Sequence, residues 1–129
     1  TYAIESTSTG GGTAYDGAVI EVSTAGPNGP WTDLGPLIMS GGYNLLMSTQ
    51  YSSPIAGRQC WSGGSLGPMT EVVVDLSSYA AQTIHVSFRW TTDSSIASSG
   101  GWYIDSVVFN SPAECEPITQ ETLEGWIVR

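Results

Sequence analysis

The chain has 129 residues, of which 12 % are charged, and twelve acidic against three basic residues give a formal net charge of −9. This length suits one domain with a usable hydrophobic core. So few basic residues cannot neutralise a row of phosphates, which argues against nucleic acid and anionic membrane surfaces as partners. The apolar runs are too short for membrane insertion. A composition rich in Gly, Ser, Thr and aromatic residues, without lysine, predicts a secreted or cell-surface β-protein.

Strand signals recur along the chain, whereas no window combines helical apolar spacing with capping residues. The predicted strands are residues 2–6, 17–24, 31–34, 59–61, 69–76, 83–91 and 100–109. Turn-forming clusters separate them, and the cluster at 25–30 makes residues 19–34 a predicted hairpin. Residues 37–53 are expected to be a long loop with a short strand, and 77–81 a turn or a single helical turn. This pattern predicts an all-β antiparallel β-sandwich of jelly-roll type over residues 1–112.

Two of these segments alternate clearly between apolar and polar positions. In residues 17–24 the apolar face carries Ala18, Ile20 and Val22. In residues 83–91 the apolar positions are Ile84, Val86, Phe88 and Trp90. Because successive side chains of a strand point to opposite faces, both sets are predicted to face the core, Trp90 included.

The C-terminal segment 113–129 differs in composition from the rest, with four glutamates between Glu114 and Glu124. Three interpretations stay open. It is a disordered acidic tail, the opening strand of a following module, or an extra strand that completes this or a neighbouring sheet. The last interpretation allows self-association through this segment, because strand addition covers exposed sheet edges and can build filaments.

Cys60 and Cys115 are the two cysteines, and their spacing is that of neither a redox motif nor a zinc knuckle. In an oxidising compartment they are expected to form a disulfide, which would stabilise the fold by roughly 4 kcal/mol in the chain-entropy model. The alternative is two unpaired thiols.

Asp105 is one acidic residue within the apolar and aromatic segment Gly100 to Phe109. A buried carboxylate is costly unless a cation or several hydrogen bonds satisfy it. Asp105 is therefore the pivotal residue of the predicted last strand.

Four segments together resemble a known type of module: residues 15–24 (YDGAVIEVST), 31–35 (WTDLG), 56–61 (AGRQCW) and 70–105, which end in WYID. They are similar to the non-catalytic jelly-roll modules of secreted bacterial proteins, such as those that follow the catalytic domain of immune-inhibitor-A-type and fungalysin-type metallopeptidases. A more distant similarity is to MAM domains and galactose-binding-like modules. Ser106 departs from this pattern, because many relatives have a second aspartate there, and so does Cys60.

The resemblance implies a structural calcium ion that joins the last strand to an early one. Calcium takes six to eight oxygen ligands, mostly from carboxylates, backbone carbonyls and water. Asp105 is the first candidate ligand, followed by Glu5 and Asp16, which flank a Ser/Thr/Gly loop. The alternative is an Asp105 that Arg89 or backbone amides satisfy without a metal.

The sequence contains no nucleophile–base or zinc motif, which argues against catalysis. The resemblance implies a non-catalytic extracellular accessory module with a binding or spacer role. Its expected partners are a glycan or a protein at the cell surface, or neighbouring modules. The candidate binding residues are Tyr43, Tyr51 and Trp61, since exposed aromatic rings stack on sugars and anchor protein partners. Two alternatives are a carbohydrate-binding module and a structural subunit of a surface filament or layer that assembles by strand exchange.

Overall fold

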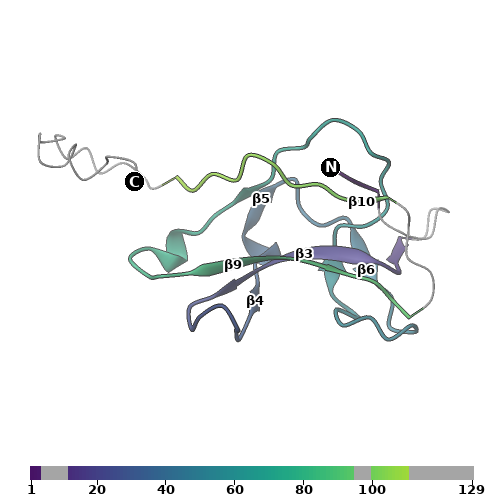
Figure 1. Cartoon of the computed structure of the whole chain (residues 1–129), viewed down its shortest axis with the longest axis horizontal. Helices are drawn as coiled ribbons and strands as arrows, with labels where there is room; N and C mark the ends of the chain where they lie inside the picture. The colour runs from purple at the N-terminus through teal and green to yellow at the C-terminus, as the bar shows by residue number, and fades with distance from the viewer. Residues whose placement is uncertain (4–11, 95–99, 111–129) are drawn as a thin grey trace, which may run out of the picture.

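The computed structural model describes residues 1–3, 12–94 and 100–110. These residues form ten strands and two short 3-10 helices, so the chain is β-rich as predicted (Figure 1). The strands are β1 (Tyr2–Ala3), β2 (Thr13–Ala14), β3 (Gly17–Ser23), β4 (Thr32–Asp33), β5 (Ile38–Ser40), β6 (Leu45–Met47), β7 (Gln59–Cys60), β8 (Val73–Val74), β9 (His85–Thr91) and β10 (Gly101–Trp102). The helices are η1 (Gly35–Leu37) and η2 (Ser77–Tyr79).

The centre of the fold is an antiparallel sheet with the strand order β4–β3–β9. Strands β3 and β9 pair over seven residues, from Gly17 opposite Thr91 to Ser23 opposite His85. On the other edge of β3, Glu21 lies opposite Asp33 of β4, which confirms the predicted hairpin. Alternating β-branched residues suit such a pleated, packed position.

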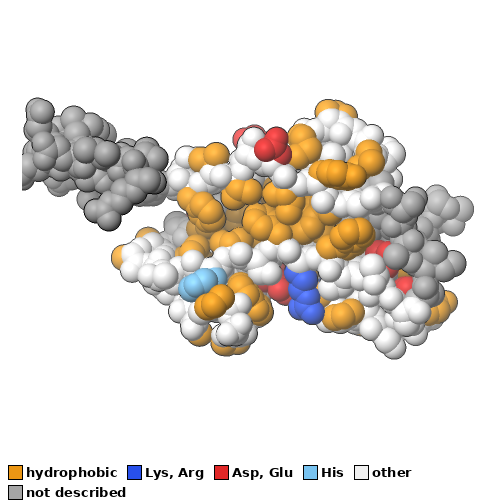
Figure 2. Space-filling view, viewed as in Figure 1, with side chains coloured by type: hydrophobic (Ala, Val, Ile, Leu, Met, Phe, Trp, Pro, Cys, Tyr) orange, Lys and Arg blue, Asp and Glu red, His pale blue; other side chains and the backbone are white. Residues whose placement is uncertain are grey.

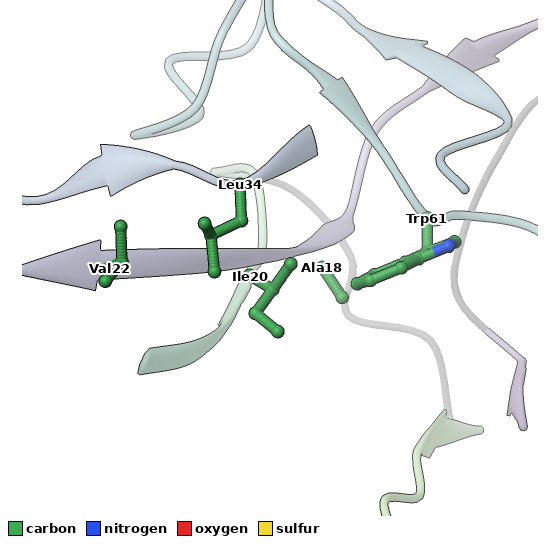
Figure 3. Close-up of a cluster of buried hydrophobic side chains, with 5 residues drawn as sticks. All are labelled: Ala18, Ile20, Val22, Leu34 and Trp61. Carbon is green, nitrogen blue, oxygen red and sulfur yellow. The ribbon is translucent and has the colours of Figure 1, made fainter. Parts of the chain in front are cut away.

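All seven residues of β3 are buried, because other parts of the chain cover both of its faces. On one face the core consists of Ala18, Ile20, Val22, Leu34 and Trp61, which point toward one another in Figure 3. On the other face Val19 packs with Ala14, Met47, Ile55 and Cys60. The alternation seen in the sequence thus separates two cores rather than a core from solvent.

Short sheets form the outer layers. The pairs β1–β10 and β5–β8 place half-buried side chains against the Trp61 core, among them Tyr2, Trp102, Ile38 and Val74. The sheet β2–β6–β7 belongs to the Met47 core on the opposite side. The pair β2–β6 is parallel, whereas the other pairs of strands are antiparallel in the part of the chain that the structure describes.

The structure corrects two predicted strands. Within residues 69–76 only Val73–Val74 form a strand, and within residues 100–109 only Gly101–Trp102 do. Both strands are short because each pairs with a short partner, β5 and β1 respectively. The predicted helical turn at 77–81 is confirmed as η2. In the described ranges, no helix has the length and hydropathy that a bilayer crossing requires.

Candidate functional site

One side of the central sheet carries a cluster of charges around the buried carboxylate of Glu21. Glu21, only 3 % exposed, accepts a hydrogen bond of 2.7 Å from Nη1 of Arg58. The same guanidinium donates from Nη2 to Oδ2 of Asp33 at 2.9 Å and from Nε to the same oxygen at 3.2 Å. Arg89 of β9 lies farther away, with its Nη1 3.8 Å from Oε1 of Glu21. We name these four residues the charge cluster.

The register of β3 and β4 explains why this cluster needs an arginine. Glu21 and Asp33 are directly opposite each other, and like charges at such positions repel. Arg58 lies between the two carboxylates and bonds both. Burial lowers the pKa of its guanidinium, but the hydrogen bonds to Glu21 and Asp33 outweigh that effect and raise it. The buried carboxylate of Glu21 is therefore paired within the protein, as a buried charge must be.

Tyr43 extends this cluster toward the Trp61 core. Its hydroxyl donates to Oδ1 of Asp33 at 2.8 Å and accepts the backbone N–H of Ile20 at 3.0 Å. Its ring meets Trp61 edge-on, with centroids 4.7 Å apart. Burial, followed by the hydrogen bond to Asp33, raises the pKa of the Tyr43 hydroxyl well above its ordinary range. A hollow lies beside these groups, and three of its polar lining residues, Asp33, Tyr43 and Arg58, are hydrogen-bonded to one another within the protein.

The other side of the central sheet carries an apolar surface that is only partly covered. Val86, Phe88 and Trp90 of β9 lie opposite the core residues Val22, Ile20 and Ala18 and share their face. Phe88 is nevertheless 40 % exposed and Trp90 42 % exposed. Figure 2 shows hydrophobic side chains gathered in a belt between β9 and the part of the molecule that contains β5 and β10. We name Val86, Phe88 and Trp90 the open face.

An exposed apolar segment follows β10. Tyr103, Ile104, Val107, Val108 and Phe109 are between 43 % and 70 % exposed, and in the view of Figure 1 the segment runs from β10 past β5 to the end of the described chain. Within the described residues its backbone forms three hydrogen bonds. Tyr103 N–H donates to the carbonyl of Thr1 at 2.9 Å, the carbonyl of Tyr103 accepts from the N-terminal ammonium of Thr1 at 3.2 Å, and Ser106 N–H donates to Oδ1 of Asp105 at 2.7 Å. Ser106 has a φ of 54°, in the left-handed region that a regular strand avoids. We name residues 103–109 the free segment.

The candidate metal ligands do not meet in the described part of the chain. Asp105, expected among buried apolar neighbours, is exposed, because the free segment leaves the sheet after Trp102. Its carboxylate accepts the backbone N–H of Ser106 at 2.7 Å. Asp16 is fully buried, and its Oδ1 accepts the N–H of Asp93 at 2.9 Å. Glu5 lies outside the described residues, and those described hold no group of three acidic, His or Cys side chains that fits a metal ion.

The three candidate aromatic residues do not share a surface. Trp61 belongs to the core, is 5 % exposed and donates its indole N–H to the carbonyl of Gly41 at 2.8 Å. Tyr43 is half-buried and hydrogen-bonded through its hydroxyl. Tyr51 is exposed and meets the ring of Tyr15 edge-on, with centroids 5.4 Å apart. Trp90, which the sequence analysis placed in the core, is 42 % exposed, because the described residues cover β9 only in part.

Cys60 has a free, fully buried thiol that donates to the carbonyl of Leu45 at 3.7 Å. Burial raises the pKa of this thiol to about 11, although the positive charge of Arg58 lowers it in part. Cys115 lies outside the described residues, so the disulfide stays a prediction.

Two features of the site were missed by the sequence analysis. The charge cluster had one local signal, the acidic residues Glu21 and Asp33 on the two strands of the predicted hairpin, which call for a nearby cation. The open face had no such signal in the sequence. Alternation identifies an apolar face of a strand but does not show which part of the chain covers that face. No protein-family model, no curated protein and no solved structure matches the chain.

Proposed function

We propose that the chain is a non-catalytic extracellular accessory module of jelly-roll type, which holds another polypeptide through its open face. The observation that supports this most directly is the pair of aromatic side chains, Phe88 and Trp90, exposed side by side on one face of a regular strand. The ring of Trp102 lies beside Phe88, with centroids 6.0 Å apart, and Figure 2 shows hydrophobic side chains gathered between β9 and the part of the molecule that contains β5 and β10. Apolar surfaces of this kind on a soluble protein mark sites of interaction.

The layers support the sandwich interpretation. The pairs β1–β10 and β5–β8 pack on the same core and on the same side of the central sheet. A strand between these two pairs would make them one sheet that faces β4–β3–β9, which is the arrangement of a two-layer β-sandwich. The free segment continues directly from β10 and has the β-prone composition of such a strand.

The charged and nucleophilic groups support a non-catalytic role. Glu21, Asp33 and Arg58 bond one another, and the thiol of Cys60 is buried in its protonated form at neutral pH. His85 has a buried Nδ1 without a hydrogen-bond partner in the described part of the chain, so no carboxylate orients its ring there. A general base in catalysis is normally oriented by such a partner.

Dye binding tests the proposed function. A polarity-sensitive dye such as bis-ANS should bind the dilute protein at the open face, and Trp90→Ser should weaken that binding several-fold. The control is Leu46→Ser, which removes an exposed apolar side chain from β6, in the layer on the other side of the central sheet. Binding that is absent at every protein concentration, or that Trp90→Ser leaves unchanged, contradicts an accessible open face.

Carbohydrate binding is a second candidate, because two exposed aromatic rings on one face are what a sugar-stacking site requires. Electrophoresis through gels that contain a soluble polysaccharide tests it. Retardation that disappears in Trp90→Ser supports this candidate, and unchanged mobility in a panel of glucans, xylans and mannans opposes it.

The structural calcium remains a prediction. Asp16 is the candidate ligand that is buried, and Asp105 is the one that is exposed. If calcium binds the native state alone, millimolar calcium should raise the unfolding midpoint by several degrees relative to EDTA. Asp16→Asn and Asp105→Asn identify the ligand, because the variant that lacks a true ligand loses this shift. Equal midpoints in calcium and EDTA contradict the prediction.

A further inference from the structure

We propose that the polypeptide held by the open face is a second copy of the same chain, and that two copies exchange their free segments. Each free segment would lie as an added strand over Phe88 and Trp90 of its partner. This inference rests on the proposed function, since it names the occupant of the same open face.

The free segment has the properties of a donor strand. Its five apolar side chains are Tyr103, Ile104, Val107, Val108 and Phe109, and all of them are more exposed than an ordinary buried strand allows. Beyond Tyr103 its backbone amides and carbonyls make no hydrogen bond to another element within the described residues. An unpaired strand of this composition can add to the exposed edge of a sheet. Its backbone groups then form hydrogen bonds with that edge, and its apolar side chains are buried.

The open face has the matching properties of an acceptor. A strand that lies over the open face belongs to the layer of β5 and β8, which packs on the same core. In the described part of the chain β5 pairs with β8 along one edge and has no partner strand along the other, so the backbone groups of an added strand can pair there. Trp102 lies beside Phe88 of the same chain, with ring centroids 6.0 Å apart, so donor and acceptor are neighbours in each molecule, and a two-fold pair of molecules can exchange them.

Self-complementarity argues for a second copy rather than for an unrelated partner. Every molecule carries one donor and one acceptor, so two copies satisfy both in a closed, two-fold arrangement. Two exchanged segments and the two faces beneath them would bury about 1,500 Å², which is the size of a stable interface. The net charge of −9 opposes association of two copies, and therefore added salt should strengthen the dimer.

Ser106 is the position where the free segment departs from a strand. A left-handed conformation is unfavourable for serine, and adding the strand would release it. Ser106→Val favours extended backbone and should tighten the dimer about fivefold, whereas Ser106→Gly tolerates the left-handed conformation and should weaken it about fivefold.

Sedimentation of the full chain over a concentration series tests the proposal. We expect a monomer of 13.6 kDa that converts to a dimer as concentration rises. Val107→Asp damages the donor and Trp90→Asp the acceptor, so each variant alone should be monomeric. Both side chains are exposed in the monomer, and both variants should therefore fold. Leu46→Asp, with its exposed change in the outer layer on the other side of the central sheet, should dimerise like the unmodified chain.

Mixing the two monomeric variants is the decisive step. Trp90→Asp retains an intact donor and Val107→Asp an intact acceptor, so the mixture should form a heterodimer through one exchanged segment. A dimer that persists in both single variants, or a mixture that stays monomeric, overturns the exchange. If the chain stays monomeric and binds dye at the open face, the proposed dimer is wrong, whereas the proposed function of the open face still stands. A monomer that binds no dye overturns both, because the face is then closed within one chain.

Discussion

The two faces of the central sheet differ in how completely their side chains are removed from water. On one face Glu21 is surrounded by protein and joined to Arg58 and Asp33. On the other face Phe88 and Trp90 lie beside core residues and still contact solvent. The same two strands, β3 and β9, supply both surfaces. The difference therefore comes from the layers that cover them and not from the strands.

This contrast follows from the energetics of the two kinds of group. A buried charge without its partner costs several kcal/mol, so a charge cluster has to be complete within one chain. An exposed apolar ring costs much less, since only the area left in water counts. A monomer with a partly uncovered apolar face can therefore fold and bind another strand later. A monomer with an unpaired buried charge would lose much of its stability. Variants on the two faces should show this difference.

The largest effect is expected at Arg58. Arg58→Met keeps much of the side-chain volume but leaves Glu21 and Asp33 opposite each other without their shared cation. We expect the free energy of unfolding to fall by about 3–5 kcal/mol. Urea unfolding near neutral pH measures it.

Arg89→Met is the matched control for that variant. Arg89 is more exposed than Arg58 and lies 3.8 Å from Glu21, so its loss should cost less than about 1 kcal/mol. Equal losses in the two variants would show that the cluster acts through its total charge and not through the hydrogen bonds of Arg58.

A second comparison removes apolar side chains from the two sides. Ile55 is fully buried in the Met47 core, so Ile55→Ala should lower the free energy of unfolding by about 3 kcal/mol. Phe88→Ala should lower it by only about 1 kcal/mol, because much of that ring is already in water. Both are measured at concentrations where the chain is monomeric. A loss at Phe88 as large as that at Ile55 would mean that the open face is covered.

Local sequence patterns predicted the central sheet well. Alternation located β3 and β9, the Gly/Pro/Asn cluster located the hairpin to β4, and Ser77 to Tyr79 form the expected helical turn. These elements follow from side-chain periodicity and turn chemistry, which act over a few residues.

The covering of the sheet is not local, and here the sequence-based predictions were wrong. Trp90 has the same alternation as Val86, yet it is exposed because burial depends on segments far away in the chain. Asp105 is exposed for the same reason, since its surroundings depend on where the free segment lies after Trp102. Arg58 joins the charge cluster from the residues before β7, a contact that no spacing in the sequence indicates.

A third prediction concerns pH on the buried side. Burial raises the pKa of the Cys60 thiol from an ordinary value of 9.0 to about 11. The folded state therefore holds this proton more tightly than the unfolded chain. Its contribution to stability is complete below pH 9 and is lost as pH rises through 11. We expect unfolding to become easier by about 2 kcal/mol over this range.

Cys60→Ala removes this titration and should flatten the alkaline part of the stability curve, which urea unfolding at a series of pH values measures. A slope that Cys60→Ala leaves unchanged would assign the effect to another group, and Tyr43 is the next candidate because its pKa is also raised.

A modest effect is expected at Tyr43, where the charge cluster meets the Trp61 core. Tyr43→Phe keeps the ring against Trp61 but removes the hydroxyl that bonds Asp33 and the N–H of Ile20. Asp33 retains Arg58 and the N–H of Gly35 as donors, so the carboxylate stays satisfied and the cost should be about 1 kcal/mol. A loss as large as that of Arg58→Met would mean that Tyr43 holds the arginine in place, and the two faces of the sheet would then share one cooperative network.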